Sequence, residues 1–256
     1  MSVMAANLAL ALAVSASAAA APPATDTLSL RGHRQFVHLY GTRGAGDPVI
    51  VSSGDGGWMH LGPHVAEFLA SKGFFVVGFD AKAYLESFTT NTATLSQDDV
   101  VADFRVLIDY AAKGSVKRPL LAGVSEGAGL SVLAATDSSL KGTIAGVIAL
   151  GLPDLNELGW RWKDAVIYFT HTAPKEPTFS SASVIARVAP LPLAAIHSTN
   201  DEFVPLTEIQ RIVGQAAEPK KLWIVRAANH RFSDNLPDFD RSLSDAIDWV
   251  RQHQIG

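Results

Sequence analysis

The sequence predicts an α/β fold, in which a mostly parallel sheet is covered by helices on both faces and carries a short cap-like insertion. Short apolar runs, typical of buried strands, alternate along the chain with longer segments of helical periodicity. Strands joined by helices in this way are usually parallel. A glycine-flanked serine, Gly123-Val124-Ser125-Glu126-Gly127, lies where one such strand meets the helix after it. These observations indicate a single α/β domain over residues 22–256.

The composition limits the class of protein. A chain of 256 residues that is 48% hydrophobic and 18% charged can bury one sizeable core. The formal net charge of -4, without a basic stripe to neutralise phosphates, argues against nucleic acid as a partner. The chain contains no cysteine, which excludes disulfides, thiolate metal sites and a cysteine nucleophile.

The first 21 residues have the composition of a secretory signal peptide. Met4 to Ala21 is uncharged and rich in Ala, Leu and Val, and small residues precede Pro22-Pro23. The apolar core is short for a membrane span. The segment before it has no Lys or Arg, so an N-terminal helix that is not cleaved is the alternative. A signal peptide predicts a periplasmic protein.

The first part of the predicted sheet is an antiparallel hairpin followed by a buried strand. Residues 28–40 alternate loosely around Arg31-Gly32-His33, as expected for a hairpin at a sheet edge. The apolar run 48–53 is the buried strand, and it ends at Gly54-Asp55-Gly56-Gly57-Trp58. Glycines in such a loop allow the backbone to pass close to a ligand.

The later elements alternate in the same manner. Asp80 lies at the end of a predicted strand, where dinucleotide-binding proteins place the acid that binds the ribose. The chain lacks the Gly-x-Gly-x-x-Gly phosphate motif that would accompany it, so a dinucleotide site is not expected. The periodicity predicts helices at 61–72, 96–114, 128–135 and 238–252, and strands at 74–79, 120–124, 144–150, 193–198 and 221–226.

Between residues 152 and 190 the regular alternation stops. The segment contains several aromatic residues, two prolines and a serine-rich run. Long irregular segments in compact domains are often functional. It is either a lid over an active site or a surface insertion, and the sequence leaves both open.

Ser125 has the sequence context of a catalytic nucleophile. In a Gly-x-Ser-x-Gly motif the serine occupies a strained turn between strand and helix, which exposes its hydroxyl group. The backbone N–H of the next residue, here Glu126, then contributes to an oxyanion hole.

An acid and a base follow later in the chain. Asp201 comes directly after the strand 193–198, and His230 follows the strand 221–226. With Ser125 they lie at the carboxyl ends of predicted strands, the edge where open α/β sheets build their sites. Asp154, which follows another strand, is the alternative acid.

The order serine, aspartate, histidine resembles that of the α/β-hydrolase superfamily. The resemblance implies a catalytic triad of Ser125, Asp201 and His230. It also implies that the glycine loop supplies the second oxyanion N–H, which we assign to Asp55 by its place in the loop. The neighbouring Gly54, Gly56 and Trp58 are then candidates for substrate binding.

The run Ser53-Gly54-Asp55-Gly56-Gly57-Trp58 is similar to the signature of the VirJ/AcvB-type bacterial virulence proteins, and Gly123 to Ala128 is similar to their elbow. This resemblance implies a periplasmic serine hydrolase that cleaves lysyl or alanyl esters of phosphatidylglycerol at the membrane surface. Val124 and Glu126 replace an expected aromatic residue and an expected aromatic or polar one, and His230-Arg231-Phe232 replaces an expected His-His-Phe. These departures leave the triad intact.

The expected chemistry is acyl transfer through an acyl-enzyme, which needs no metal or cofactor. A further hypothesis is that the side chains of Asp55 and Glu126 determine specificity, because acidic groups beside the nucleophile would attract a cationic aminoacyl group. The alternatives are a general secreted carboxylesterase on the same fold and a non-catalytic periplasmic binding or secretion-associated protein. The sequence does not determine the oligomeric state.

Overall fold

A computed structural model describes residues 23–161 and 176–255. The predicted signal peptide lies outside the described residues, as does the middle of the irregular segment 152–190. Within the described residues no helix is both long and apolar enough to cross a bilayer.

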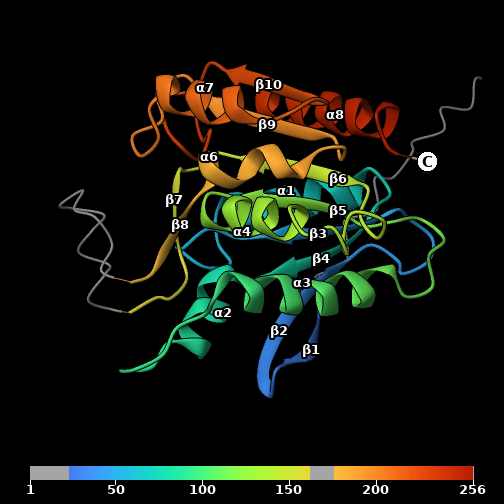
Figure 1. Ribbon diagram of the computed structural model, residues 1–256. Coiled ribbons are helices and arrows are strands. Elements are labelled where there is room, and N and C mark those ends of the chain that lie inside the picture. The colour runs from blue at the N-terminus through green and yellow to red at the C-terminus, as the bar shows by residue number, and fades with distance from the viewer. Residues whose placement is uncertain (1–22, 162–175, 256) are drawn as a thin grey trace, which may run out of the picture.

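The central sheet has eight strands in the order β1-β2-β4-β3-β5-β6-β9-β10 (Figure 1). Strands β4, β3, β5, β6, β9 and β10 are parallel, whereas β2 pairs antiparallel with β4 and with the edge strand β1. The predicted edge hairpin and mostly parallel sheet are therefore confirmed. The strands are β1 (Ala24–Leu30), β2 (His33–Tyr40), β3 (Pro48–Ser52), β4 (Phe75–Phe79), β5 (Leu120–Val124), β6 (Gly146–Leu150), β9 (Leu193–Ser198) and β10 (Lys220–Val225).

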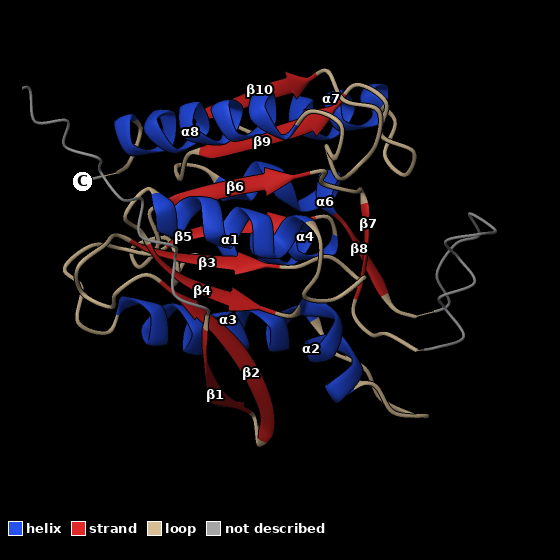
Figure 2. Cartoon of the chain, turned by 180° about the vertical axis from the view of Figure 1, so that it is seen from behind, coloured by secondary structure: helices blue, strands red, loops and turns tan. Residues whose placement is uncertain are grey.

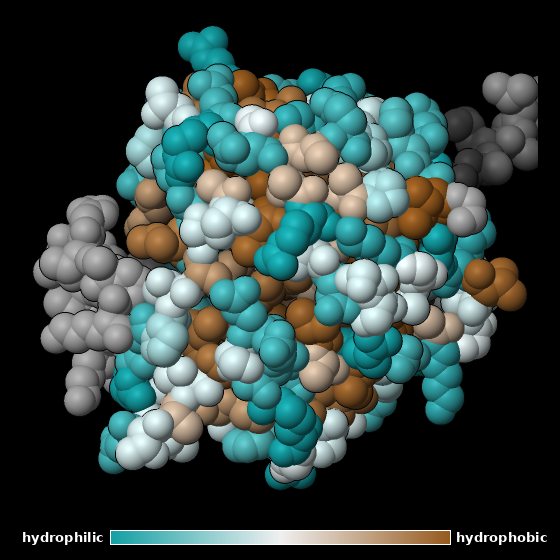
Figure 3. Space-filling view, in the orientation of Figure 1, coloured by the Kyte–Doolittle hydropathy of each residue, from teal (hydrophilic) through white to brown (hydrophobic). Residues whose placement is uncertain are grey.

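Helices cover both faces of the sheet. One face carries α1 and α8 (Figure 2), and the other carries α3, α4 and α7. Polar and apolar side chains are intermixed on the surface seen in Figure 3, as is usual for a solvated face. The helices are α1 (Leu61–Ser71), α2 (Ala81–Phe88), α3 (Gln97–Ala112), α4 (Glu126–Ala135), α6 (Ser181–Val184), α7 (Leu206–Gln215) and α8 (Leu236–Gln252), with a 3₁₀ turn η2 (Ile185–Val188).

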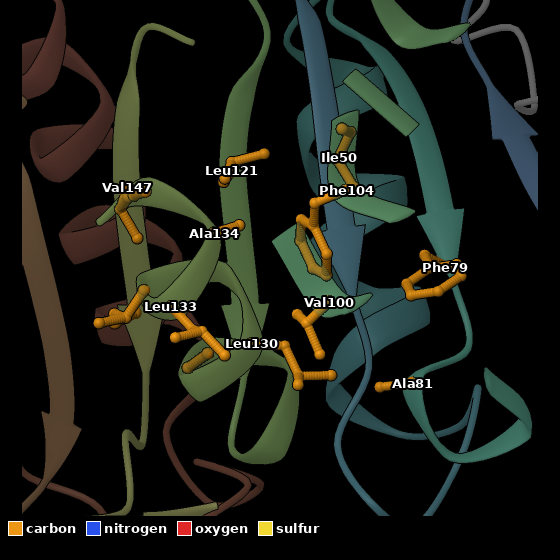
Figure 4. Packing of buried hydrophobic residues seen from close by; sticks show 14 of the residues in the cluster. Ile50, Phe79, Ala81, Val100, Phe104, Leu121, Leu130, Leu133, Ala134 and Val147 are labelled. Atoms are coloured by element: carbon orange, nitrogen blue, oxygen red, sulfur yellow. The ribbon is translucent and has the colours of Figure 1, made fainter. Parts of the chain in front are cut away.

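Each face of the sheet has its own apolar core. Figure 4 shows one of them, where Phe104 of α3 and Leu130 of α4 pack with Ile50 and Leu121 of the sheet. The strands β3, β4, β5, β6 and β9 are buried along their whole length. This explains their continuous apolar runs, because a strand covered on both faces has no solvent side.

Helix α2 was not among the predicted elements. Asp80, which directly follows β4, is its N-cap, and the carboxylate accepts hydrogen bonds from the backbone N–H groups of Ala83 and Trp58. Tyr84, Leu85 and Phe88 form its buried stripe. The helix has only 8 residues, too few for its periodicity to stand out in the sequence.

The described ends of the irregular segment form a small second sheet. Strand β7 (Leu155–Glu157) pairs antiparallel with β8 (Thr178–Ser180), and we call this pair the cap ribbon. Asn156 lies fully buried in it, and its side-chain amide donates to Ser181 Oγ at 2.8 Å. The ribbon is thus anchored on α6 at the carboxyl edge of the main sheet.

Candidate active site

Ser125 lies in a sharp turn between β5 and α4. Its backbone has φ 51° and ψ -118°, a conformation that residues with a side chain seldom adopt. A Cβ on Gly123 would lie 2.2 Å from the carbonyl oxygen of Gly127, and one on Gly127 would lie 2.3 Å from that of Ser53. The two glycines are therefore required by close packing, as expected for a nucleophile elbow.

His230 and Asp201 form a buried pair. Nδ1 of His230 lies 2.6 Å from Oδ2 of Asp201, and the two residues are 7% and 8% exposed. The other carboxylate oxygen, Oδ1, accepts the backbone N–H groups of Phe203 and Val204, each at 2.9 Å. The carboxylate is therefore held in one orientation, with one oxygen directed at the imidazole.

The environment of Asp201 favours its charged form. Burial by itself would raise the pKa of this carboxyl, but the hydrogen bonds from His230, Val204 and Phe203 hold its pKa below the usual value. A charged Asp201 stabilises the imidazolium that forms when a histidine acts as a base.

Asp154, the alternative acid, has other partners. Its carboxylate accepts hydrogen bonds from Ser180 Oγ at 2.6 Å and from the Ala182 backbone at 2.9 Å, and it forms an ion pair with Arg211 at 2.5 Å. The hydrogen bonds hold the cap ribbon and the start of α6. Of the two candidate acids, Asp201 is therefore the one whose carboxylate contacts His230.

Ser125 and His230 line the same cavity, which has a volume of about 500 Å³. Within the described part of the chain, Nε2 of His230 is buried and has no hydrogen-bond partner, so it makes no hydrogen bond to the Ser125 hydroxyl. Catalytic hydrogen bonds are often loose in the absence of substrate. Nε2 is the atom that would take the proton of the serine.

Gly151 makes room for the imidazole. It follows β6 with φ 60°, and a Cβ there would lie 2.5 Å from Cε1 of His230. Gly151 was not among the residues expected at the site. A glycine directly after a central strand, at the same edge as Ser125 and Asp201, is a signal that could have found it.

The two proposed oxyanion donors border the cavity. Asp55 and Glu126 both line it, and no hydrogen bond between described residues uses either backbone N–H. Glu126 is the first residue of α4, where backbone N–H groups have no partner within the helix. Both groups are thus available to a ligand beside Ser125.

The glycine loop approaches Ser125 closely. A Cβ on Gly54 would lie 3.2 Å from Cβ of Ser125, and Gly56 also lines the cavity.

The assignment of Trp58 as a substrate-binding residue is corrected by the structure. Trp58 is not among the residues that line the cavity. Its indole stacks on the ring of His38 at 4.8 Å between centroids and packs against Gly78 of β4, where a Cβ would lie 2.3 Å from the ring. The large apolar ring is more stable against the sheet than in a solvated loop.

The side chain of Glu126 is engaged within the protein. It is 6% exposed, and Oε1 accepts a hydrogen bond from the backbone N–H of Glu157 at 2.7 Å. Burial, together with the nearby charges of Asp55 and Glu157, raises the pKa of Glu126 well above its usual value. This environment disfavours the negative charge that attraction of a cation would require.

Other residues of the cavity escaped the sequence analysis because they come from separate loops. Met59, Leu155 and Phe203 are exposed apolar residues that all line the cavity. Phe203 also makes an edge-to-face contact with His230, with 5.5 Å between ring centroids. No local pattern marks these residues, because only the fold brings them to one opening. Among the described residues no group of His, Cys, Asp and Glu is arranged to hold a metal ion.

The parallel sheet, the serine elbow and the His–Asp pair at the carboxyl edge together define an α/β-hydrolase fold. Solved structures that share it include an α/β-hydrolase of Penicillium, with a TM-score of 0.67 and 14% identity over 91% of this chain and 99% of that one. Est1E from Butyrivibrio proteoclasticus has a TM-score of 0.65 and 15% identity over 88% and 98% of the two chains. A membrane phospholipase A described as a bacterial virulence factor has a TM-score of 0.65 and 12% identity over 90% and 87%.

The chain also resembles a family of bacterial proteins in part of its length. Residues 47–157 match the profile of the family described as bacterial virulence protein (VirJ). The matched segment contains the glycine loop and Ser125 and ends before Asp201 and His230. Two uncharacterised proteins, each from a strain of Mycobacterium tuberculosis, are 26% identical over 217 residues, which cover 83% of this chain and 71% of theirs.

Proposed function

We propose that the protein is a serine hydrolase that cleaves carboxylic esters, with Ser125 as nucleophile, His230 as base and Asp201 as the acid that orients it. The observation that carries the proposal is the 2.6 Å contact between His230 Nδ1 and Asp201 Oδ2. It leaves the opposite ring nitrogen of His230 without a partner among the described residues, in a ring that lines the same cavity as Ser125.

The reaction proceeds in two acyl transfers. Nε2 of His230 accepts the hydroxyl proton as Oγ of Ser125 bonds to the ester carbonyl carbon, and the backbone N–H groups of Asp55 and Glu126 stabilise the oxyanion. The carbon–oxygen bond to the alcohol breaks, and the alcohol leaves with the proton from His230. Water then attacks the acyl-enzyme by the same route and releases the acid and free Ser125.

The substrate we propose is an aminoacyl ester of phosphatidylglycerol, lysyl or alanyl, hydrolysed at the periplasmic membrane surface. The resemblance to VirJ supports it, and so does the lining of the cavity. Acidic Asp55 and Glu157 suit an ammonium group, while the exposed apolar Met59, Leu155 and Phe203 suit a lipid. A phospholipase among the structural neighbours has the same fold. The predicted signal peptide supports the location.

Hydrolysis of lysyl- and alanyl-phosphatidylglycerol in vesicles, beside a short-chain ester such as p-nitrophenyl acetate, tests the proposal. We expect release of the amino acid by the wild-type protein and none by Ser125→Ala. Activity on the short-chain ester alone would retain the hydrolase and reject the lipid substrate. Absence of serine-dependent activity on all three would overturn the proposal and favour a binding protein.

A further inference from the structure

His197 is a buried titratable residue that the proposed mechanism does not use. It lies on β9, is 0% exposed, and does not line the active-site cavity. Its Nε2 lies 2.8 Å from the carbonyl oxygen of Val204 and 3.8 Å from Oδ2 of Asp201. Its Nδ1 is buried and has no hydrogen-bond partner within the described ranges.

These contacts determine the protonation of the ring. A carbonyl oxygen only accepts hydrogen bonds, so Nε2 of His197 carries a proton and donates it to Val204. A proton on Nδ1 as well would place a buried N–H where no described residue accepts it. Burial lowers the pKa of His197, although the nearby charge of Asp201 and the hydrogen bond to Val204 both act in the opposite direction. The ring is therefore neutral, with its proton on Nε2.

Val204 connects His197 to the triad acid. The carbonyl of Val204 accepts from His197, and its N–H donates to Oδ1 of Asp201 at 2.9 Å. Both polar groups of this one residue are thus engaged, one by β9 and one by the carboxylate. The ring of His197 thus holds the Val204 end of the loop that begins at Asp201. Oδ2 of Asp201 lies 2.6 Å from Nδ1 of His230.

We propose that His197 is a positioning residue of the active site: through Val204 it fixes the loop that aims Asp201 at His230. The inference rests on the proposed function, since it concerns the same site. His197 transfers no proton in the reaction. Because it is neutral, the negative charge of Asp201 is not shared with a second cation and acts on the imidazolium of His230.

The test compares three variants of the full chain. His197→Gln can present an N–H close to the position of Nε2, whereas His197→Asn is too short to reach Val204 and His197→Leu has no donor. Ile196→Val, a buried change in the adjacent residue of β9, is the control for general loosening of the strand. The rate of Ser125 labelling by a fluorophosphonate probe, followed from pH 5 to pH 9, reports activation of the serine without reference to any substrate.

We expect His197→Leu and His197→Asn to be labelled at least ~10-fold more slowly, because a small displacement of a catalytic group can cost about 100-fold. The acidic midpoint of their pH profiles is expected to fall, since a less well oriented Asp201 stabilises the imidazolium less. His197→Gln and Ile196→Val should be labelled at a rate within about threefold of that of the wild type, and the acidic midpoint of their pH profiles should not change. If His197→Leu does not fold, the Gln and Asn variants decide the question.

A second measurement separates this inference from the proposed function. The downfield NMR resonance of the His230 Nδ1 proton reports its hydrogen bond to Asp201 whether or not the protein is an enzyme. Its loss in His197→Asn and retention in His197→Gln supports the inference, even if the wild type is not labelled. Wild-type labelling with an unchanged rate and resonance in His197→Asn would overturn it while leaving the hydrolase proposal intact.

Discussion

Oε1 of Glu126 accepts a hydrogen bond from the backbone N–H of Glu157 at 2.7 Å, so the residue after Ser125 is joined directly to the cap ribbon. Glu126 therefore has two separate tasks in the structure. Its backbone N–H is positioned beside Ser125, and its carboxyl group anchors β7 at the same cavity.

Glu126→Gln is expected to become more stable relative to the wild type as the pH rises. The pKa of Glu126 is raised in the folded protein, so the folded state holds a proton that the unfolded state loses above about pH 4.5. The contribution of Glu126 to the stability of the wild type is therefore fully present below that pH. It is lost as the pH rises toward the pKa of Glu126 in the folded protein. Glutamine mimics the protonated form at every pH. Urea unfolding at pH 5, 7 and 8.5 measures the free energy of unfolding of both proteins. The advantage of Glu126→Gln over the wild type should grow by up to about 1.4 kcal/mol per pH unit.

The same variant tests whether Glu126 selects a cationic substrate. Glutamine retains an oxygen for the N–H of Glu157, so we expect the lysyl-to-alanyl activity ratio to change less than about threefold. Glu126→Ala loses the anchor and is expected to lose activity on both lipids. A selective loss of lysyl activity in Glu126→Gln would restore the specificity hypothesis for this side chain.

Asp201→Asn is expected to reduce kcat/KM by about 1000-fold or more, because an amide neither fixes the imidazole tautomer nor stabilises its charge. Asp154→Asn is the matched control: this carboxylate also follows a strand but contacts Ser180, Ala182 and Arg211. It should lower stability and leave kcat/KM within about threefold. Equal losses of activity in the two variants would contradict the assignment of the acid.

Gly151→Ala should displace the ring of His230, since the new Cβ would lie 2.5 Å from Cε1. We expect about a 100-fold loss of activity. Gly73→Ala is the control, because Gly73 has φ 87° and no atom within 4 Å of the added Cβ. Both substitutions strain the backbone by about 1 kcal/mol, which thermal unfolding would detect, but only the first should affect activity per folded molecule.

Asp103→Asn is expected to destabilise the fold by about 3 kcal/mol without a direct effect on the active site. The buried carboxylate of Asp103 accepts hydrogen bonds from the Arg31 guanidinium and, at 2.7 Å, from the hydroxyl of Tyr84. It thereby connects the edge hairpin, α2 and α3. Asp109→Asn on the exposed side of the same helix should change the free energy of unfolding by less than about 0.5 kcal/mol.

The agreement between sequence and structure is greatest where the signal is local. The strand 120–124, the helix 96–114 and the edge hairpin were predicted from periodicity and turn residues, and the structure has β5, α3 and β1–β2 there. The capping box of Ser96 and Asp99 is likewise a signal within four residues. A pattern of this kind can be read from sequence because the residues that produce it are neighbours in the chain.

The sequence by itself determined the class of fold and the order of Ser125, Asp201 and His230, because each follows a recognisable strand. Tertiary structure alone decided that Asp201 and not Asp154 faces His230, and that Trp58 packs against Gly78 instead of the cavity. It also decided that Glu126 is buried beneath the cap ribbon. The physical reason is that the direction of a side chain past a strand end depends on hydrogen bonds from distant segments. Periodicity carries no information about such contacts.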